Sequence, residues 1–135
     1  MTKEEKQLLL RDLSARISYG VIVNCCDMVG EKVTSIDENG LINNDYDIDE
    51  VKPYLFPLSS MSEEQKRELD ERYLNTINNN RIYIRYHSQG YWDNDTEAEF
   101  NDYLWLIEWF LLNHFDYRGL IPKGLALDAT GLGIY

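Results

Sequence analysis

Three segments of the chain carry hydrophobic residues at the three- and four-residue spacing of an α-helix. We predict helices over Lys3–Arg16, Glu63–Thr76 and about Glu97–Asn113. Each is preceded by a capping box, in which a Ser or Thr side chain and a Glu or Gln three residues later satisfy each other's backbone amides. The pairs are Thr2 with Glu5, Ser60 with Glu63 or Ser62 with Gln65, and Thr96 with Glu99.

Other segments show the β-branched composition and the two-residue alternation of strands. A run over Val21–Cys26 and an alternating run over Lys32–Asp37 predict a hairpin that turns at Asp27–Gly30. Asn39-Gly40 favours a type I′ turn, which would return the chain through Leu41 and Ile42 as a third strand. A fourth strand is predicted at Arg81–Tyr86.

Proline and glycine determine the remaining segments. Pro53 and Pro57 discourage a strand or helix between them, so Tyr54–Phe56 is predicted to be an apolar connector. The tail Leu120–Tyr135 is loop-rich, with one short strand at Leu125–Leu127. We therefore predict one α+β domain over residues 1–135, in which a small antiparallel sheet of three or four strands is covered by about three helices.

The predicted helix Glu97–Asn113 is hydrophobic almost all round and carries two hydrophobic stripes on different sides. The sequence has to be interpreted to decide which stripe faces the core. We expect the first stripe to be core and Leu104→Ala to cost about 2 to 5 kcal/mol. We expect the second stripe to be covered by the tail segment Leu120–Leu127 or by a partner. The first stripe comprises Phe100, Tyr103, Leu104, Ile107, Phe110, Leu111 and His114, of which Phe100, Leu104, Ile107 and Leu111 are named as core, and the second comprises Trp105, Leu106, Trp109 and Leu112.

The charge of the chain restricts its partners. It has 13 Lys and Arg against 24 Asp and Glu, a net charge of −11 at pH 7, which opposes general binding to nucleic acid or anionic membrane.

The N-terminal residues do not show the pattern of a signal peptide, in which basic residues are followed by an apolar segment, so we expect a cytoplasmic protein. The adjacent Cys25 and Cys26 are badly placed to bridge each other and are predicted to be reduced thiols. Acidic runs at Asp45 and Asp93 lack the glycine and the bidentate glutamate of a calcium loop, and we predict no metal and no cofactor.

The segment Tyr86–Tyr117 combines ten of the 17 aromatic residues with seven acids and has no Lys or Arg. In one interpretation, the aromatic residues fill a core and the acids lie at its rim. The other is a protein-binding face, on which Trp92, Trp105 and Trp109 anchor a basic partner inside an acidic border.

Two further groups of residues are candidates for chemistry. His87, His114 and Asp116 are the only material for a general base with an orienting carboxylate. The alternative for His114 is a residue at a helix C-terminus, where a partly charged imidazole meets the carbonyl groups. Arg118 could bind an anion, or it could pair locally while Gly119 or a neighbour stops the helix.

Several blocks of sequence resemble a group of small uncharacterised acidic proteins from gut bacteria, their phages and mobile elements. The blocks cover about half of the chain and are Met1–Glu5, Leu8–Asp12, Tyr19–Val23, Lys52–Glu64 and His114–Leu127. The resemblance implies a phage-related setting and a shared domain. It implies no activity, cofactor or catalytic residue.

The leading hypothesis for function is a non-enzymatic accessory protein of a phage or mobile element that binds another protein, one of basic character. The tentative binding residues are Trp92, Trp105, Trp109 and Arg118. One alternative is a small enzyme or ligand-binding domain that uses His87, His114 and Asp116. Another is a structural homo-oligomer that pairs through the aromatic helix.

Overall fold

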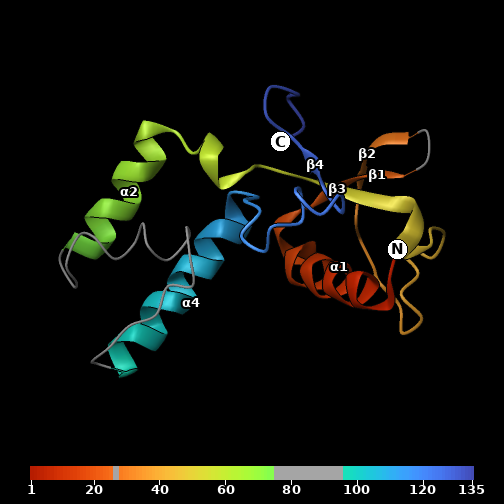
Figure 1. The fold of residues 1–135 in the computed structure, drawn as a ribbon, viewed down its shortest axis with the longest axis horizontal. Coiled ribbons are helices and arrows are strands. Elements are labelled where there is room, and N and C mark those ends of the chain that lie inside the picture. Colours follow the sequence, from red (N-terminus) through yellow and green to blue (C-terminus); the bar gives the residue numbers. More distant parts are fainter. Residues whose placement is uncertain (26–27, 75–95) are drawn as a thin grey trace.

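The fold is α+β, as predicted, and combines helices with a four-stranded sheet (Figure 1). The computed structural model describes residues 1–25, 28–74 and 96–135. The helices are α1 (Lys3–Arg16), α2 (Glu63–Leu74) and α4 (Thr96–Leu112), with short 3₁₀ turns at η1 (Ile17–Tyr19), η2 (Ile48–Glu50) and η3 (Leu58–Ser60). The strands are β1 (Ile22–Cys25), β2 (Met28–Lys32), β3 (Val51–Leu55) and β4 (Leu127–Asp128).

The helix predictions are confirmed, and two of the helix starts show why. In α1 the Glu5 amide donates to Thr2 Oγ1 at 3.1 Å, and the Thr2 amide donates to Glu5 Oε1 at 2.9 Å. In α2 the capping box uses the Ser62 register: the Gln65 amide donates to Ser62 Oγ at 3.1 Å. Helix α4 begins and ends one residue before its predicted limits. The first few residues of α1 and α2 therefore carry enough local information to set the start of each helix.

The sheet differs from the prediction in several strands, and it is not purely antiparallel as predicted. The order is β2-β1-β3-β4, with antiparallel pairs between β1 and its two neighbours and a parallel pair between β3 and β4, so the sheet is mixed. The second strand lies at Met28–Lys32 rather than Lys32–Asp37, because it begins inside the segment Asp27–Gly30 that was predicted to be the turn. The short tail strand lies at Leu127–Asp128, at the end of the predicted Leu125–Leu127.

The third strand of the sheet is the segment that was predicted to be a proline-bracketed connector. Residues Val51–Leu55 pair with β1, and Pro53 is in register with Val23. Strand β4 pairs only with Tyr54 and Leu55, which follow Pro53 in the chain. Pro53 has no backbone N–H to donate, but it lies at a position where β4 makes no ladder contact.

The predicted strand after Asn39-Gly40 does not form. Gly40 has φ 79°, but Asn39 is not among the described residues with positive φ, so the turn is not type I′. The Gly40 amide instead donates to Asp37 O at 3.0 Å, and Ile42 makes only isolated bridges. The predicted strand Arg81–Tyr86, together with His87, Trp92 and Cys26, lies outside the described residues.

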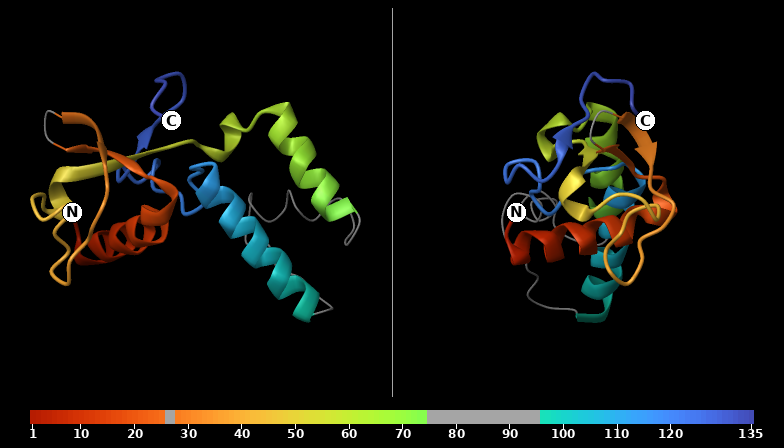
Figure 2. Two further views of the ribbon diagram at one scale, coloured as in Figure 1. Left: turned by 180° about the vertical axis from the view of Figure 1, so that it is seen from behind. Right: turned by 90° about the vertical axis from the view of Figure 1, so that its right-hand side faces the viewer.

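Two hydrophobic clusters divide the described molecule. The first joins α1 to the sheet and the tail, and the second joins α2 to α4. Figures 1 and 2 show the matching arrangement, with α1 packed along the sheet at one end and the α2 and α4 pair at the other. The first includes Leu9, Leu13, Val21, Val23, Leu55, Leu120 and Leu125. The second comprises Met61, Leu69, Leu106, Trp109, Phe110 and Phe115 as buried members.

The expected assignment of the two stripes of α4 is confirmed for Leu111, which is buried, and wrong for Leu104 and Ile107, which are 46% and 39% exposed. In the second stripe, Leu106 and Trp109 are buried in the cluster that joins α4 to α2, and Leu112 is 64% exposed. The side chain of Phe100 lies outside the described part. The tail does not cover the second stripe, because Leu120 and Leu125 pack in the first cluster. The face of α4 that is buried was therefore decided by α2 and Phe115.

A buried ion pair lies at the junction of the two halves. Arg16 Nε donates to Asp12 Oδ2 at 2.7 Å, one helical turn away in α1, and both side chains are fully buried. Arg16 Nη2 also donates to the backbone oxygen of Phe115 at 2.7 Å. Next to it, the Phe56 amide donates to His114 O at 2.9 Å and the Asp116 amide to Phe56 O at 2.8 Å. The C-terminal end of α4 is thus attached to both α1 and the end of β3.

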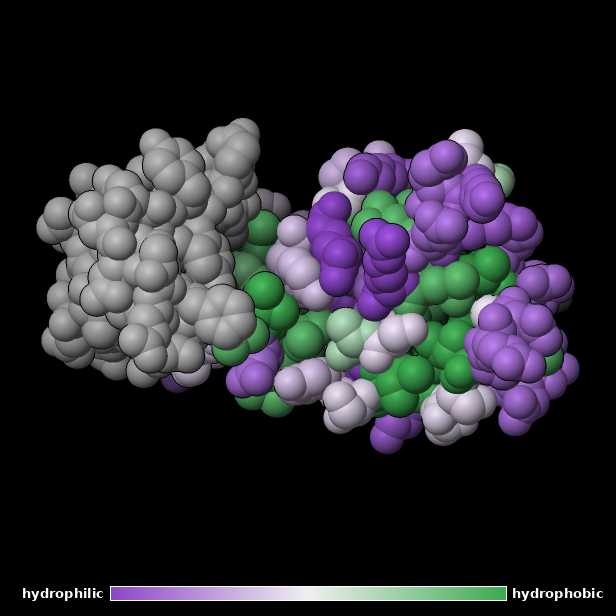
Figure 3. All heavy atoms as spheres, turned by 90° about the horizontal axis from the view of Figure 1, so that it is seen from below, coloured by the Kyte–Doolittle hydropathy of each residue, from purple (hydrophilic) through white to green (hydrophobic). Residues whose placement is uncertain are grey.

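The surface of the half formed by α1 and the sheet is mixed in character. Seen from below, it presents hydrophilic residues with hydrophobic residues between them (Figure 3). Within the described residues, no helix has both the length and the apolar composition needed to cross a membrane.

Candidate functional site

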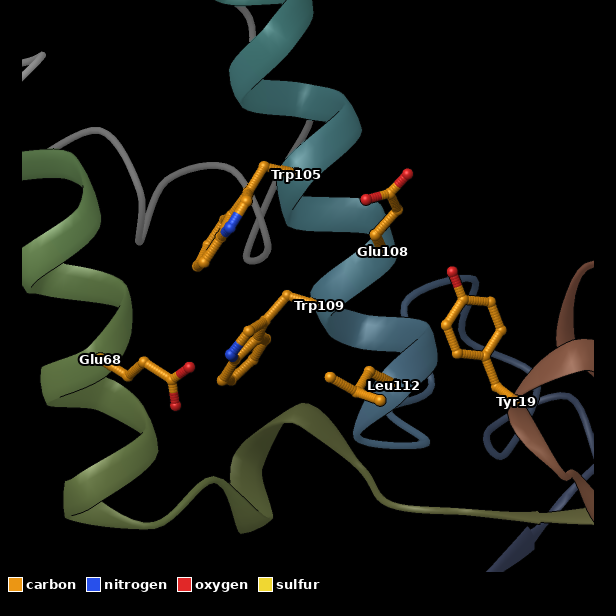
Figure 4. Close-up of a pocket in the computed structure, with 6 residues that line it drawn as sticks. All are labelled: Tyr19, Glu68, Trp105, Glu108, Trp109 and Leu112. Atoms are coloured by element: carbon orange, nitrogen blue, oxygen red, sulfur yellow. The ribbon is translucent and has the colours of Figure 1, made fainter.

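A groove crosses α4 and is walled by three elements of the structure. It has a volume of about 300 Å³. Tyr19 comes from η1 and Glu68 from α2, while the other side chains come from successive turns of α4 (Figure 4). We call it the Trp105–Trp109 groove, and its lining residues are Tyr19, Glu68, Trp105, Glu108, Trp109 and Leu112.

The two tryptophans form the aromatic part of the groove. Their ring centroids lie 6.4 Å apart and their planes are inclined by 22°. Trp109 is 5% exposed and belongs mainly to the core, where it stacks on Phe115 at 5.5 Å and 16°. Trp105 is half-buried. Residues at i and i+4 lie one above the other on a helix, so α4 holds two nearly parallel indoles on one side.

The groove is acidic. Glu68 extends from α2 toward the indole of Trp109, whereas Glu108 projects from the other side of α4, where the hydroxyl end of Tyr19 is directed toward it (Figure 4). Both glutamates are exposed, and no lysine or arginine is among the described residues that line the groove. The indole Nε1 of Trp109 is buried and has no hydrogen-bond acceptor among the described residues. The described lining therefore combines aromatic side chains with carboxylates, the groups that attract an organic cation.

Apolar residues continue from the groove along α4. Leu112 lines the groove and is 64% exposed, and Ile107 and Leu104 are exposed about one and two turns earlier. An exposed apolar strip next to an acidic groove is the composition of a protein-binding surface with a polar rim.

The histidine and carboxylate of the enzyme hypothesis are not a functional pair. The Asp116 carboxylate accepts hydrogen bonds from the backbone amides of Leu120 and Ile121 at 2.8 and 2.9 Å. His114 Nδ1 has no hydrogen-bond partner among the described residues, and its ring stacks on Tyr135 at 3.6 Å and 10°. The carboxylate thus stabilises a turn, and it does not orient the imidazole.

His114 stops helix α4. Its φ is 60°, its amide donates to Leu111 O at 3.2 Å, and the Phe115 amide donates to Phe110 O at 2.9 Å, which together form a Schellman motif. Burial lowers the pKa of the imidazole to about 4, and the charge of Arg16 acts in the same direction. The expectation of a partly charged imidazole is therefore wrong, because the ring is neutral at pH 7. A pKa of about 4 is also too low for an effective general base near neutrality.

The lowered pKa of His114 predicts a loss of stability in acid. The unfolded residue has a pKa of 6.5 and the folded one of about 4. Between these values the unfolded chain binds a proton that the folded chain does not, so this contribution falls as pH drops from 6.5 to 4 and then stays constant. Urea unfolding at pH 7, 5.5 and 4.5 would measure it against His114→Asn, since asparagine tolerates positive φ and does not titrate. The stability advantage of the wild type over the variant should shrink toward pH 4. An advantage that is equal at all three pH values would contradict the assignment.

Arg118 has a structural role that differs from the predicted local pairing. Its Nε lies 3.3 Å from Asp12 Oδ1, and its guanidinium lies over the ring of Tyr117 at 5.3 Å. It joins the tail to α1 and lies outside the Trp105–Trp109 groove. The positive φ that stops the helix is at His114, and Gly119 has a separate positive φ of 73°.

Tyr19 and Glu68 were not among the predicted site residues. Both come from elements distant in sequence from α4, so no local pattern connects them with the tryptophans. Within the described residues, no group of three or more His, Cys, Asp or Glu side chains could hold a metal ion. We found no match to this chain among protein-family models, curated proteins or solved structures.

Proposed function

We propose that the protein binds a basic segment of another protein at the Trp105–Trp109 groove. The observation that carries the proposal is a groove whose described lining combines two nearly parallel indoles with two exposed glutamates and no lysine or arginine. The net charge of −11 adds a long-range attraction for a basic partner and a repulsion between copies of the chain, which disfavours the homo-oligomer alternative. This activity suits an accessory protein of a phage or mobile element, the setting that the sequence resemblance implies.

A protein partner fits the surface better than a small cation does. A small cation would fill the groove and leave Leu104 and Ile107 in water, whereas a polypeptide segment could cover them as well. Aromatic anchors surrounded by a polar rim are the usual centres of binding energy at protein interfaces.

Removal of the two groove carboxylates should weaken the binding of a basic peptide. The probe is a fluorescein-labelled 12-residue peptide in which glycine alternates with equal numbers of arginine and lysine, followed by anisotropy. We expect Glu68→Gln/Glu108→Gln to raise its Kd by about tenfold or more, the effect of about 1.4 kcal/mol of lost attraction.

The matched control separates the groove from the net charge. Glu4→Gln/Glu38→Gln removes two exposed carboxylates outside the groove and changes the total charge by the same amount. It should change the Kd by less than about twofold, because distant surface charges are screened by salt. Equal effects of the two double variants would overturn the groove as the binding site.

A further inference from the structure

We propose that the end of the β1–β3 ladder beside His114 is a binding site for one phenol side chain, and that the chain's own Tyr135 is its occupant. We call it the Tyr135 site. It is formed by the backbone of Ile22 and Tyr54 and by the rings of Phe56 and His114. None of these residues is among the described lining of the groove, so the inference is independent of the proposed function.

The hydroxyl of Tyr135 takes the place of a ladder bond. Strands β1 and β3 pair antiparallel with Val23 opposite Pro53, so the next pair outward is Ile22 opposite Tyr54. Here the Ile22 amide donates to Tyr135 Oη at 2.9 Å, and Tyr135 Oη donates to Tyr54 O at 2.8 Å. The hydroxyl thus lies between an amide and a carbonyl on neighbouring strands, the two groups that a ladder bond joins directly. A ligand that replaces it has to accept and donate through one atom, as a phenol hydroxyl does.

The ring of Tyr135 lies against two aromatic side chains. It stacks on the imidazole of His114 with the centroids 3.6 Å apart and the planes inclined by 10°, and its centroid lies 6.0 Å from that of Phe56. Burial lowers the pKa of His114 to about 4 and raises the pKa of Tyr135. Both rings are therefore uncharged at pH 7, and the hydroxyl keeps the proton that it donates. A planar ring with one hydroxyl matches the site in shape and in hydrogen bonding.

The walls of the Tyr135 site are held by contacts that do not involve Tyr135. The Phe56 amide donates to His114 O at 2.9 Å, and the Phe56 ring packs on Phe115 with the centroids 6.3 Å apart. The Schellman motif at the end of α4 fixes the backbone of His114. Because these contacts remain when Tyr135 leaves, we expect the site to stay formed and to accept another phenol.

The segment that leads to Tyr135 is attached to the molecule mainly by this side chain. Residues 130–133 lie between the buried Ala129 and Tyr135, and all four are exposed. A segment with few buried contacts opens at a low cost in free energy. We therefore expect a tyrosine side chain of another molecule to compete with Tyr135 for the same contacts.

Binding of p-cresol, the side chain of tyrosine as a free molecule, tests the site in the full chain. Tyr135→Gly removes the occupant, and toluene has the same shape as p-cresol without the hydroxyl. We expect p-cresol to bind Tyr135→Gly at least about tenfold tighter than toluene, because toluene cannot bridge the Ile22 amide and the Tyr54 carbonyl. Titration of the NMR chemical shift of the Ile22 amide gives both dissociation constants.

The wild type and Leu132→Gly are the matched controls. Both keep Tyr135, and Leu132 lies in the same segment with 56% of its surface exposed. We expect p-cresol to bind each of them at least about tenfold more weakly than Tyr135→Gly, because the tethered occupant competes with it. Equal binding of p-cresol and toluene would overturn the proposal. So would equal binding of p-cresol to the wild type and Tyr135→Gly, or no binding to a folded Tyr135→Gly.

Tyr135→Phe tests the hydroxyl without emptying the site, and it decides the proposal if Tyr135→Gly does not fold. The ring remains, but the Ile22 amide loses its acceptor. Hydrogen exchange of this amide should be at least about tenfold faster than in the wild type. The amide of Asn24, which lies further along the β1–β3 ladder, should exchange at its wild-type rate. An unchanged rate at Ile22 would show that the hydroxyl does not bridge the strands and would overturn the site.

Discussion

Asp12→Ala is expected to destabilise the protein by about 3 to 5 kcal/mol, the usual result of leaving one partner of a buried ion pair without its countercharge. Asp12 and Arg16 are both fully buried and are joined by a hydrogen bond of 2.7 Å. Arg118 lies 3.3 Å from the same carboxylate, so the substitution leaves two guanidinium groups without their acid. Urea or thermal unfolding would measure the loss.

A second acid that pairs with α1 provides the control. Asp49 lies 3.1 Å from Lys6, but these side chains are 48% and 41% exposed. Asp49→Ala should therefore cost less than about 1 kcal/mol. Asp12→Leu/Arg16→Met should recover part of the stability lost in Asp12→Ala, because it removes the buried charge together with its partner. A loss for Asp12→Ala as small as that for Asp49→Ala would show that the pair is not buried in solution.

Leu106→Ala is expected to cost about 2 to 5 kcal/mol, the range for emptying a packed site. Leu106 is 4% exposed and packs in the cluster that joins α4 to α2. Because Leu106 is one of the described buried residues that join the two helices, the cavity removes part of the contact between them. The midpoint of urea denaturation measures the change.

Leu104→Ala is the matched control on the same helix. Leu104 is 46% exposed, so its truncation should change the free energy of unfolding by less than about 1 kcal/mol. This is the opposite of what the apolar stripes alone predict. If Leu104→Ala were the more destabilising of the two variants, the orientation of α4 in the structure would be wrong.

The sequence predicts the helix starts well because capping is local. Thr2 with Glu5 and Ser62 with Gln65 are three residues apart, and each pair satisfies the amides that the first helical turn leaves unpaired. The end of α4 was predicted to within one residue, but the residue that stops it was not, because His114 rather than a glycine adopts the positive φ. Its ring is held by stacking on Tyr135, a contact across 21 residues that no local pattern shows.

The orientation of α4 and the identity of β3 depend on contacts distant in sequence. A helix that is apolar all round has no periodicity that marks its buried face, and here Leu69 and Phe115 decide it. Pro53, considered alone, argues against a strand because it has no backbone N–H. It is tolerated in β3 because β4 does not pair with Pro53 itself. The buried Asp12 and Arg16 could have been found, since they share one helical face with Leu9 and Leu13.

The candidate site was predicted in part. Trp105 and Trp109 were identified from their position on an acidic, aromatic helix, and the structure places both in one groove. Glu68 and Tyr19 complete it from other elements, and Arg118 lies elsewhere. Trp92 and His87 lie outside the described residues.

The described buried residues form two clusters, and the buried members of the α2 and α4 cluster include none from α1 or the sheet, so the two clusters can open separately. Apart from Tyr19, the described lining of the groove comes from α2 and α4, and a ligand that touches both Glu68 and Trp105 clamps these two helices together. In the proposed complex, part of the binding free energy is used to hold α2 and α4 together. We expect the bound partner to slow hydrogen exchange of the backbone amides in these two helices.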